Sequence, residues 1–206
     1  MLISVEGVEV AGSHTPLLLP TSLEAGSGEV TLVAGDPGYG HVALALVLGG
    51  RLLPTGGRVA LDGDEDPVTR QRQLALVDVP GVSAPEDGIP VRAVLAEELA
   101  LAGQAARRAD VDAFLQEHDA GELARRRWEE LPADLRTAWL AGIAGRRHGV
   151  TALLLANPDR FGGHPRSWWA VARDLAGQGF AVIVQCSHAS LRLLGEPVRF
   201  ELGAAA

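Results

Sequence analysis

The chain has 206 residues, of which 47% are hydrophobic, enough to bury the core of one domain. Its net charge of -8 excludes a general nucleic-acid binder and a protein held on a membrane by charge alone, because both need clustered cations. All 18 basic residues are arginine, so no reaction of this chain can depend on a lysine of its own.

The apolar stretches and the single cysteine set two further limits. The longest apolar runs, 42–48 and 151–156, are far shorter than the roughly 20 residues that cross a bilayer, so we expect neither membrane insertion nor an export signal. Cys186 is the only cysteine, which excludes an internal disulfide and a cysteine-based zinc site. It lies in an apolar run, and we expect a buried structural thiol, not a reactive one.

The first predicted elements form a small antiparallel patch. Residues 2–10 and 17–23 have the composition of two strands, and 58–62 adds another after the first helix. Between them, the short apolar run 29–34 predicts a buried strand. The glycine-rich turn that follows leads into the apolar run 42–48, which is long enough for a helix.

The remaining core elements predict an α/β sandwich. Near-continuous apolar runs are typical of parallel strands that helices cover on both faces. Three such runs occur, at 74–79, 152–156 and 180–186. A helical pattern over 167–176 ends at Gly177 and leads into the strand 181–185, which completes one βαβ return.

Between residues 90 and 127 the sequence changes character. Apolar residues recur at helical spacing among charged ones over 91–101 and 109–115, which predicts a small helical subdomain. The Pro- and Gly-rich loop 80–90 is the predicted hinge into it. We expect the last residues, 203–206, to be frayed. The predicted organisation is one domain in three parts, 1–88, 89–130 and 131–206.

The turn after the first buried strand has the glycine spacing of a phosphate loop. In the pattern G-x-x-x-x-G-K-[ST], backbone N–H groups surround phosphate, Lys reaches the terminal phosphates and Ser/Thr binds magnesium. The glycines are present, but the lysine and the hydroxyl are not. The corresponding residues are Gly35, Asp36, Pro37, Gly38, Tyr39, Gly40, His41 and Val42. Alone, this loop fits a tight strand-to-helix turn equally well.

The surrounding sequence closely resembles the ATP-binding cassette of ABC transporters. The segments 28–35 and 52–63 resemble its start. Later segments follow in the order of that family: 130–144 at the signature motif and its helix, 153–158 at the Walker B strand, and 182–188 ending at the switch histidine. The resemblance therefore covers essentially the whole chain.

This resemblance implies a P-loop NTPase-like α/β fold, with a mainly parallel sheet, an N-terminal antiparallel β subdomain and a helical insert. It also implies nucleotide contacts from residues 35–42, and the departures fall on the positions that do the chemistry. His41 stands at the lysine, and it is shorter and mostly neutral. The sequence leaves two roles open for His41: capping the first turn of the helix, and contacting phosphate. Val42 stands at the magnesium-binding hydroxyl and cannot ligate a metal.

The other nucleotide-facing motifs also depart from the family. The glutamine-loop position falls near Asp78 or Val79, where a carboxylate at a strand end is typical of a solvated turn. The signature serine and glycines are replaced by Pro132, Ala133 and Asp134, which removes an N–H donor and adds negative charge. The family aromatic that stacks on adenine falls at Ala11.

The Walker B position ends in Ala156 and Asn157, where the family has a metal-binding Asp and a catalytic Glu. Asn157 can position water but cannot accept its proton. His188 keeps its family identity, and we interpret it as retained fold geometry. No catalytic constellation is intact at Ala156, Asn157 and His188. We expect at most weak ATP binding, no bound magnesium and no hydrolysis.

The leading hypothesis is a degenerate, non-hydrolysing cassette subunit, a pseudoenzyme that acts in assembly or regulation. Its partners would be a membrane permease, an intact cassette (in a homo- or heterodimer), or both, and not nucleic acid. The resemblance implies a cytoplasmic chain, peripheral on the inner face of the membrane through a permease that contacts roughly 79–127. One alternative is a divergent but active ABC-type ATPase that uses His41 and water-mediated magnesium. A second is a soluble scaffold or regulator without a transporter.

Overall fold

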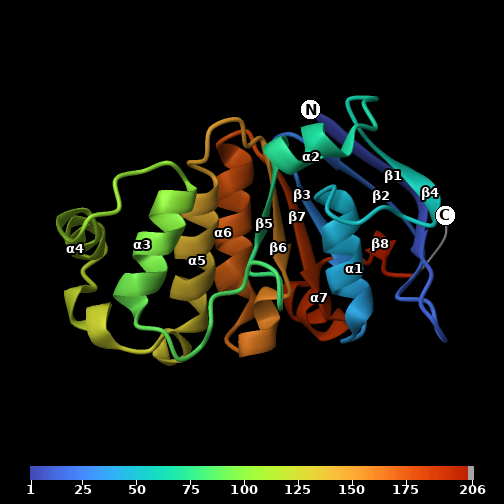
Figure 1. Cartoon of the computed structure of the whole chain (residues 1–206). Coiled ribbons are helices and arrows are strands. Elements are labelled where there is room, and N and C mark those ends of the chain that lie inside the picture. The colour runs from blue at the N-terminus through green and yellow to red at the C-terminus, as the bar shows by residue number, and fades with distance from the viewer. Residues whose placement is uncertain (204–206) are drawn as a thin grey trace.

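The computed structural model describes residues 1–203 and contains two sheets (Figure 1). The first is antiparallel, with the order β2-β1-β4, where β1 pairs with both neighbours. Its strands are β1 (Leu2–Val10), β2 (Leu18–Gly26) and β4 (Gly56–Leu61). The predicted antiparallel patch is therefore confirmed.

The second sheet is parallel throughout and has the order β5-β6-β7-β3-β8. Its strands are β3 (Val30–Ala34), β5 (Leu74–Val77), β6 (Ala152–Ala156), β7 (Ala181–Cys186) and β8 (Phe200–Glu201). Every residue of β5, β6 and β7 is buried, as the near-continuous apolar runs predict. The sequence did not predict β8, which has only two residues.

Seven α-helices lie around the sheets within residues 1–203. They are α1 (Tyr39–Leu48), α2 (Pro67–Gln73), α3 (Val91–Leu101), α4 (Arg108–Glu117), α5 (Ala133–Ala144), α6 (Pro165–Gly177) and α7 (His188–Leu194). Short 3₁₀ turns are η1 (Gly121–Arg125), η2 (Trp128–Glu130) and η3 (Pro158–Phe161). Within the described residues, none of these helices combines the length and apolar character needed to span a bilayer.

Two apolar layers cover the two faces of the parallel sheet. Along β6, Leu153 and Leu155 pack with α3, α5 and α6, whereas Leu154 packs with α1 and the antiparallel sheet. In β7, Val182 packs in the same layer as Leu153, and Ile183 packs in the same layer as Leu154. Successive side chains of a strand point to opposite faces, so each strand serves both layers. Figure 1 shows α3, α5 and α6 on one side of the sheet and α1 on the other.

The first and last residues of the helical insert lie side by side and are joined by backbone hydrogen bonds. The Val91 backbone N–H donates to the Arg126 carbonyl at 2.9 Å, and Trp128 N–H donates to Ile89 at 2.8 Å. α3 and α4 pack together in the insert, and Phe114 of α4 meets Trp139 of α5 edge to face. The fold class that the sequence predicts is confirmed, including the insert.

Local predictions differ from the structure in three places. The helix C-terminal turn uses Gly179, with φ of 99°, because Gly177 is still helical. Asp66 caps α2, which was not predicted, by accepting from Val68 N–H at 3.1 Å. In the tail predicted to be frayed, Gly203 N–H donates to Thr21 Oγ1 at 2.9 Å, and residues 204–206 lie outside the described residues.

The thiol and the tryptophans lie mostly in the core. Cys186 is fully buried, and burial raises the pKa of its thiol to about 12, so it is a structural residue as predicted. Trp128, Trp139 and Trp168 are buried, while Trp169 is half-buried against the same apolar layer. No tryptophan is fully exposed.

The contact between α5 and the insert predicts a stability effect. We expect Trp139→Ala to lower the free energy of unfolding by about 3–5 kcal/mol, because a large buried ring is lost and a cavity remains. Trp169→Ala, at the half-buried neighbour, should cost clearly less. Urea unfolding followed by far-UV circular dichroism measures both; equal losses would contradict this assignment of the core.

Candidate functional site

The predicted phosphate loop connects β3 to α1 at the carboxyl end of the parallel sheet. Residues 35–38 bend between the two elements, and the helix begins at Tyr39 with no side-chain cap at Gly38. Gly35 N–H donates to the Cys186 carbonyl at 3.1 Å, which fixes the start of the loop against β7. The segment therefore makes the strand-to-helix turn that its glycines predict, not a hairpin.

His41 folds into this loop. Its ring is 3% exposed, and neither ring nitrogen makes a hydrogen bond. Cε1 and Nε2 lie 3.0 Å from the position that a Cβ on Gly35 would occupy. The ring therefore contacts the inside of the loop and does not cap the helix. Burial lowers the pKa of His41, and the nearby Gly35 backbone opposes this shift only in part, so the ring is neutral near pH 7.

The C-terminal strand also contacts the loop. Leu202 follows β8 and its backbone N–H donates to the Ala34 carbonyl at 2.7 Å. Its side chain lies 2.8 Å from a Cβ built on Gly35 and 2.7 Å from one built on Gly40. These two glycines therefore accommodate Leu202 by close packing. Substituting either with alanine would force the C-terminal segment to move.

His188, at the switch position, lies between two carboxylates. Its Nε2 is 2.9 Å from Glu201 Oε1, and its Nδ1 is 3.7 Å from Asp36 Oδ1. The two nitrogens point to different sides of the ring, so these acids do not converge on one point. The side chain that senses phosphate in the family is here held by the chain's own negative charge.

β6, the strand that the resemblance aligns with Walker B, is followed by no free carboxylate among residues 156–159. Ala156 is buried, and Asn157 adopts a left-handed conformation with φ of 45°. The nearest acid, Asp159, accepts from Ser187 N–H at 2.9 Å and from the Ser187 and Ser190 hydroxyls at 2.7 Å. Asp159 therefore fixes the start of α7, and Asn157 offers only an amide.

Asp78 is not the solvated turn residue that its place at a strand end predicts. Its side chain is 7% exposed, and Arg160 Nη2 lies 2.7 Å from its Oδ1. Burial raises the pKa of Asp78, and the Arg160 guanidinium opposes that shift. Arg160 also donates to the Ala156 carbonyl, so it connects the ends of β5 and β6. A guanidinium thus occupies the edge of the sheet between the glutamine-loop and Walker B positions.

A second arginine extends this connection to the signature position. The Phe161 ring lies between two guanidinium groups, with Arg160 4.1 Å and Arg136 3.6 Å from its centroid. Arg136, in α5, also pairs with Asp87 of the hinge loop at 3.2 Å. Pro132 precedes α5 and Asp134 is exposed in its first turn, so the residues that the resemblance aligns with the signature motif lie at the start of this helix.

Comparison with known proteins confirms the fold. No protein-family model and no curated protein matches the sequence. A solved nucleotide-free ATP-binding cassette of an ABC transporter matches over 94% of this chain and 83% of its own, at 17% identity and a TM-score of 0.64. An ABC transporter ATP-binding subunit matches over 93% and 82%, at 15% identity and a TM-score of 0.62. The cbiO1 protein of Clostridium perfringens, part of the transporter complex cbiONQ, matches over 90% and 78%, at 16% identity and a TM-score of 0.61.

This chain has the fold of an ABC transporter ATP-binding cassette. The fold that the family resemblance implies is thereby confirmed. The structure brings together the loop 35–42, Asn157 and His188 at one edge of the cassette sheet. Ala11, at the predicted adenine position, lies exposed in a loop and presents no ring.

Four residues of the cassette edge escaped the sequence analysis. They are Arg160, Gln185, Glu201 and Leu202. Gln185 Nε2 donates to the His41 carbonyl at 2.8 Å and so ties α1 to β7. The sequence held a signal for two of them: Arg160 is a charged residue just after β6, and Gln185 is an amide within the apolar strand β7. Glu201 and Leu202 had none, because their position depends on β8 pairing beside β3.

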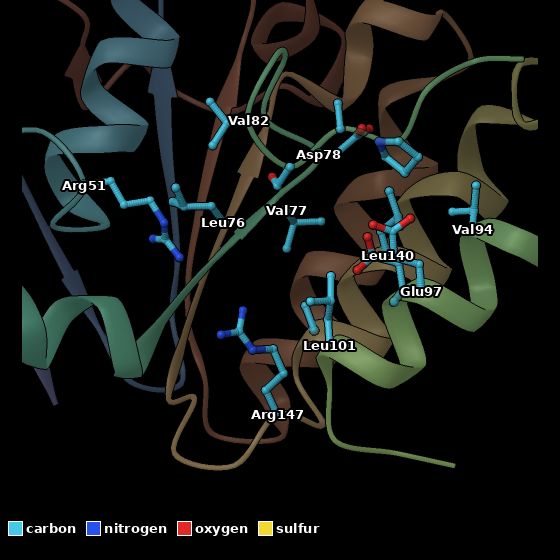
Figure 2. Close-up of a pocket in the computed structure, with 15 residues that line it drawn as sticks. Arg51, Leu76, Val77, Asp78, Val82, Val94, Glu97, Leu101, Leu140 and Arg147 are labelled. Atoms are coloured by element: carbon cyan, nitrogen blue, oxygen red, sulfur yellow. The ribbon is translucent and has the colours of Figure 1, made fainter. Parts of the chain in front are cut away.

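A separate cleft lies beside the edge strand β5, between the cassette core and the insert (Figure 2). Its volume is about 380 Å³, and its apolar wall includes Leu76, Leu101 and Leu140. Arg51 and Arg147 line it and make no ion pair with any described residue. Burial and the positive charge of nearby Arg147 lower the pKa of Arg51, because both disfavour the charged form of its guanidinium.

Acidic groups line the α3 side of the same cleft. Glu97 and Glu98 are neighbours on α3, and burial, followed by the adjacent Glu97, raises the pKa of Glu98 to about 7. The cleft therefore has a cationic wall, an acidic wall and an apolar surface between them. In Figure 2, Arg51 lies at the left of the cleft, Arg147 below it and Glu97 at its right.

The neutral ring of His41 predicts a pH dependence of stability. Its folded pKa lies below its unfolded value near 6.5, so the unfolded state binds the proton more readily. Its contribution is therefore present above about pH 6.5 and is lost as pH falls. We expect wild type to lose stability between pH 7.5 and pH 5.5 relative to His41→Gln, by up to about 1.4 kcal/mol per pH unit. Exposed His148→Gln is the control; an identical effect there would exclude His41 as the source.

Proposed function

We propose that this chain is a non-hydrolysing ATP-binding-cassette subunit that associates with a membrane permease, an intact cassette, or both, and acts in assembly or regulation. The observation that carries the proposal is that its own side chains take up the nucleotide edge of the cassette. The buried His41 ring packs against Gly35 of the loop, Leu202 packs on Gly35 and Gly40, and Glu201 pairs with His188. On this proposal the chain is cytoplasmic and reaches the membrane only through its partner.

Electrostatics at this edge supports weak nucleotide affinity. A triphosphate at the loop would meet the carboxylates of Asp36 and Glu201 on either side of His188. It would find no lysine, and the neutral His41 supplies no compensating charge. Backbone N–H groups at the start of α1 still favour an anion, which is why weak binding remains part of the proposal.

Magnesium does not fit the residues present. Val42 has no oxygen ligand, Ala156 stands at the metal-binding carboxylate, and Asp159 is engaged by two serines. Between residues 1 and 203, no three His, Cys, Asp or Glu side chains are grouped to hold a metal ion. Phosphoryl transfer depends on cations that neutralise developing charge, so this set supports binding at most.

The charges that line the cleft beside β5 are an argument for a partner that binds near the hinge and the insert. Unpaired Arg51 and Arg147 on one wall and Glu97 and Glu98 on the other favour a segment that carries both signs of charge. Apolar residues between them can bury part of such a segment. cbiO1, which has this fold, belongs to a transporter complex, and we extend such an assembly to this chain as part of the proposal.

Two rival functions are distinguished by simple measurements. A divergent ABC-type ATPase that uses His41 and water-mediated magnesium requires turnover by the isolated protein. A soluble scaffold or regulator without a transporter requires no association with membrane proteins.

The first prediction concerns activity and its repair. We expect no magnesium-dependent ATP hydrolysis above background. Replacing His41 with Lys and Val42 with Thr should tighten nucleotide binding about tenfold, because a phosphate cation and one magnesium ligand are restored. Hydrolysis should stay absent, since the groups at Ala156 and Asn157 that act in the transition state are still missing. Calorimetry and a phosphate-release assay measure the two quantities side by side.

Further variants separate binding from chemistry. Adding Ala156→Asp and Asn157→Glu should be necessary for hydrolysis, yet insufficient in a homodimer, because Pro132 and Asp134 remain at the signature half of each site. Adding Glu201→Gln to the His41, Val42 double variant should tighten binding further by removing one repelling carboxylate. Hydrolysis by the double variant alone would establish the divergent-ATPase function.

The second prediction concerns the partner. Arg147→Glu should release the chain from the membrane fraction of its native host, since it reverses one of the unpaired charges of the cleft. Arg146→Glu is the matched control, because its side chain lies outside this cleft and near Phe114. Affinity capture from solubilised membranes, quantified against the wild-type chain, measures both. Absence of any membrane partner for wild type would favour the scaffold function.

A further inference from the structure

A second groove lies on the helical insert, on the other side of α3 from the cleft beside β5. Its volume is about 560 Å³, and α3, α4 and η1 enclose it. The surface between the helices consists of small side chains, Ala93, Ala96, Ala106, Val111 and Ala124. Alanines leave the space between the helices open, so the groove is a consequence of the sequence at these positions.

Arginines surround this small apolar surface. Arg92, Arg108 and Arg125 line the groove, and no acidic residue does. Asp112 is the only carboxylate paired with them, at 2.6 Å from Arg92 and 3.9 Å from Arg108. Arg125 makes no ion pair within residues 1–203. Three guanidinium groups thus share one counter-ion, in a chain whose net charge is -8.

The local hydrogen bonds also leave more guanidinium donors than carboxylate acceptors around the groove. Arg92 Nη1 is buried and has no hydrogen-bond partner, which is costly for a charged donor. Asp110, the other acid at this end of α4, accepts from the Arg107 backbone N–H at 2.8 Å and is engaged there. A carboxylate arriving from outside would instead reach the exposed guanidinium groups of Arg108 and Arg125, of which only Arg108 has a counter-ion in the described part of the chain, at 3.9 Å.

We propose that this groove is a docking site for an acidic, leucine-containing helical segment of a partner protein. An apolar side chain of the segment lies on the alanines, and its carboxylates pair with Arg108 and Arg125, beside the existing pair of Arg92 and Asp112. The groove is open along one side and floored by small residues, which suits a helix laid between two helices. The site lies on the insert, away from the loop between β3 and α1, and the proposal goes beyond the proposed cassette function (Figure 1).

The test uses the whole chain and a short fluorescein-labelled helical peptide, with Leu and Glu repeated so that they share one face. Fluorescence anisotropy at low ionic strength measures binding. We expect binding to weaken about tenfold when every Glu of the peptide is Gln, since charge-assisted hydrogen bonds are lost. It should weaken similarly when every Leu is Ser. Equal binding of either altered peptide would overturn the proposal.

Matched variants locate the site. Arg125→Ala should weaken binding about fivefold, whereas Arg126→Ala, at the next residue and outside the groove, should not. Ala93→Glu places a carboxylate in the groove and should weaken binding about tenfold, whereas Ala100→Glu, exposed on the same helix, should not. Ala93 is exposed, so its substitution leaves the core intact, and thermal unfolding verifies this. Equal effects of variant and control would overturn the assignment.

Two other occupants are outcomes of the same experiment. Sedimentation of the protein alone would detect a dimer; a dimer that Ala93→Glu dissociates would assign the groove to a second copy of this chain and overturn a foreign partner. Citrate that displaces the peptide at comparable concentration would show that the groove binds any small anion, which also contradicts the proposal.

Discussion

Parallel pairing of β3, β5, β6 and β7 is the constraint on which the site depends. The carboxyl ends of parallel strands meet at one edge of a sheet, so whatever follows each strand is brought together there. In this chain the residues that follow are Gly35, Asp78, Asn157 and Ser187, separated by up to 152 positions in sequence. Complete burial of three of these strands, with one apolar layer on each face, holds that edge rigid.

At this edge the chain pairs its own groups where a nucleotide site would use ligand and metal. The Arg160 cation lies between the ends of β5 and β6, and the Glu201 carboxylate lies against His188. Leu202 packs against Gly35 and Gly40 of the glycine loop, and the His41 ring packs against Gly35. The buried polar atoms of this edge that have no hydrogen-bond partner include both ring nitrogens of His41 and Oε1 of Gln185. Nucleotide entry would therefore compete with contacts inside the protein.

Sequence patterns predicted most of the fold because its signals are local. Continuous apolar runs located β5, β6 and β7, and helical spacing located α3 to within a residue. The glycine spacing pointed to the loop 35–42, and the family resemblance pointed to His188. The patterns failed for β8, whose two residues are a strand only because β3 offers an unpaired edge. They also failed for the burial of Asp78, because its partner Arg160 lies 82 positions away and no local pattern reports an ion pair.

The pairing of Arg160 with Asp78 has a consequence for the insert as well. Phe161 stacks between Arg160 and Arg136, and Arg136 pairs with Asp87 in the hinge loop. One connected set of ion pairs and cation–π contacts thus runs from the sheet edge through α5 to the base of the insert. The Arg136 side chain is 4% exposed and that of Asp87 is 61% exposed, so solvent screens this ion pair from the Asp87 side only. Rotation of the insert against the core would have to break this set of contacts, which therefore opposes any change in the relative position of the two surfaces proposed for partners, the cleft beside β5 and the groove on the insert.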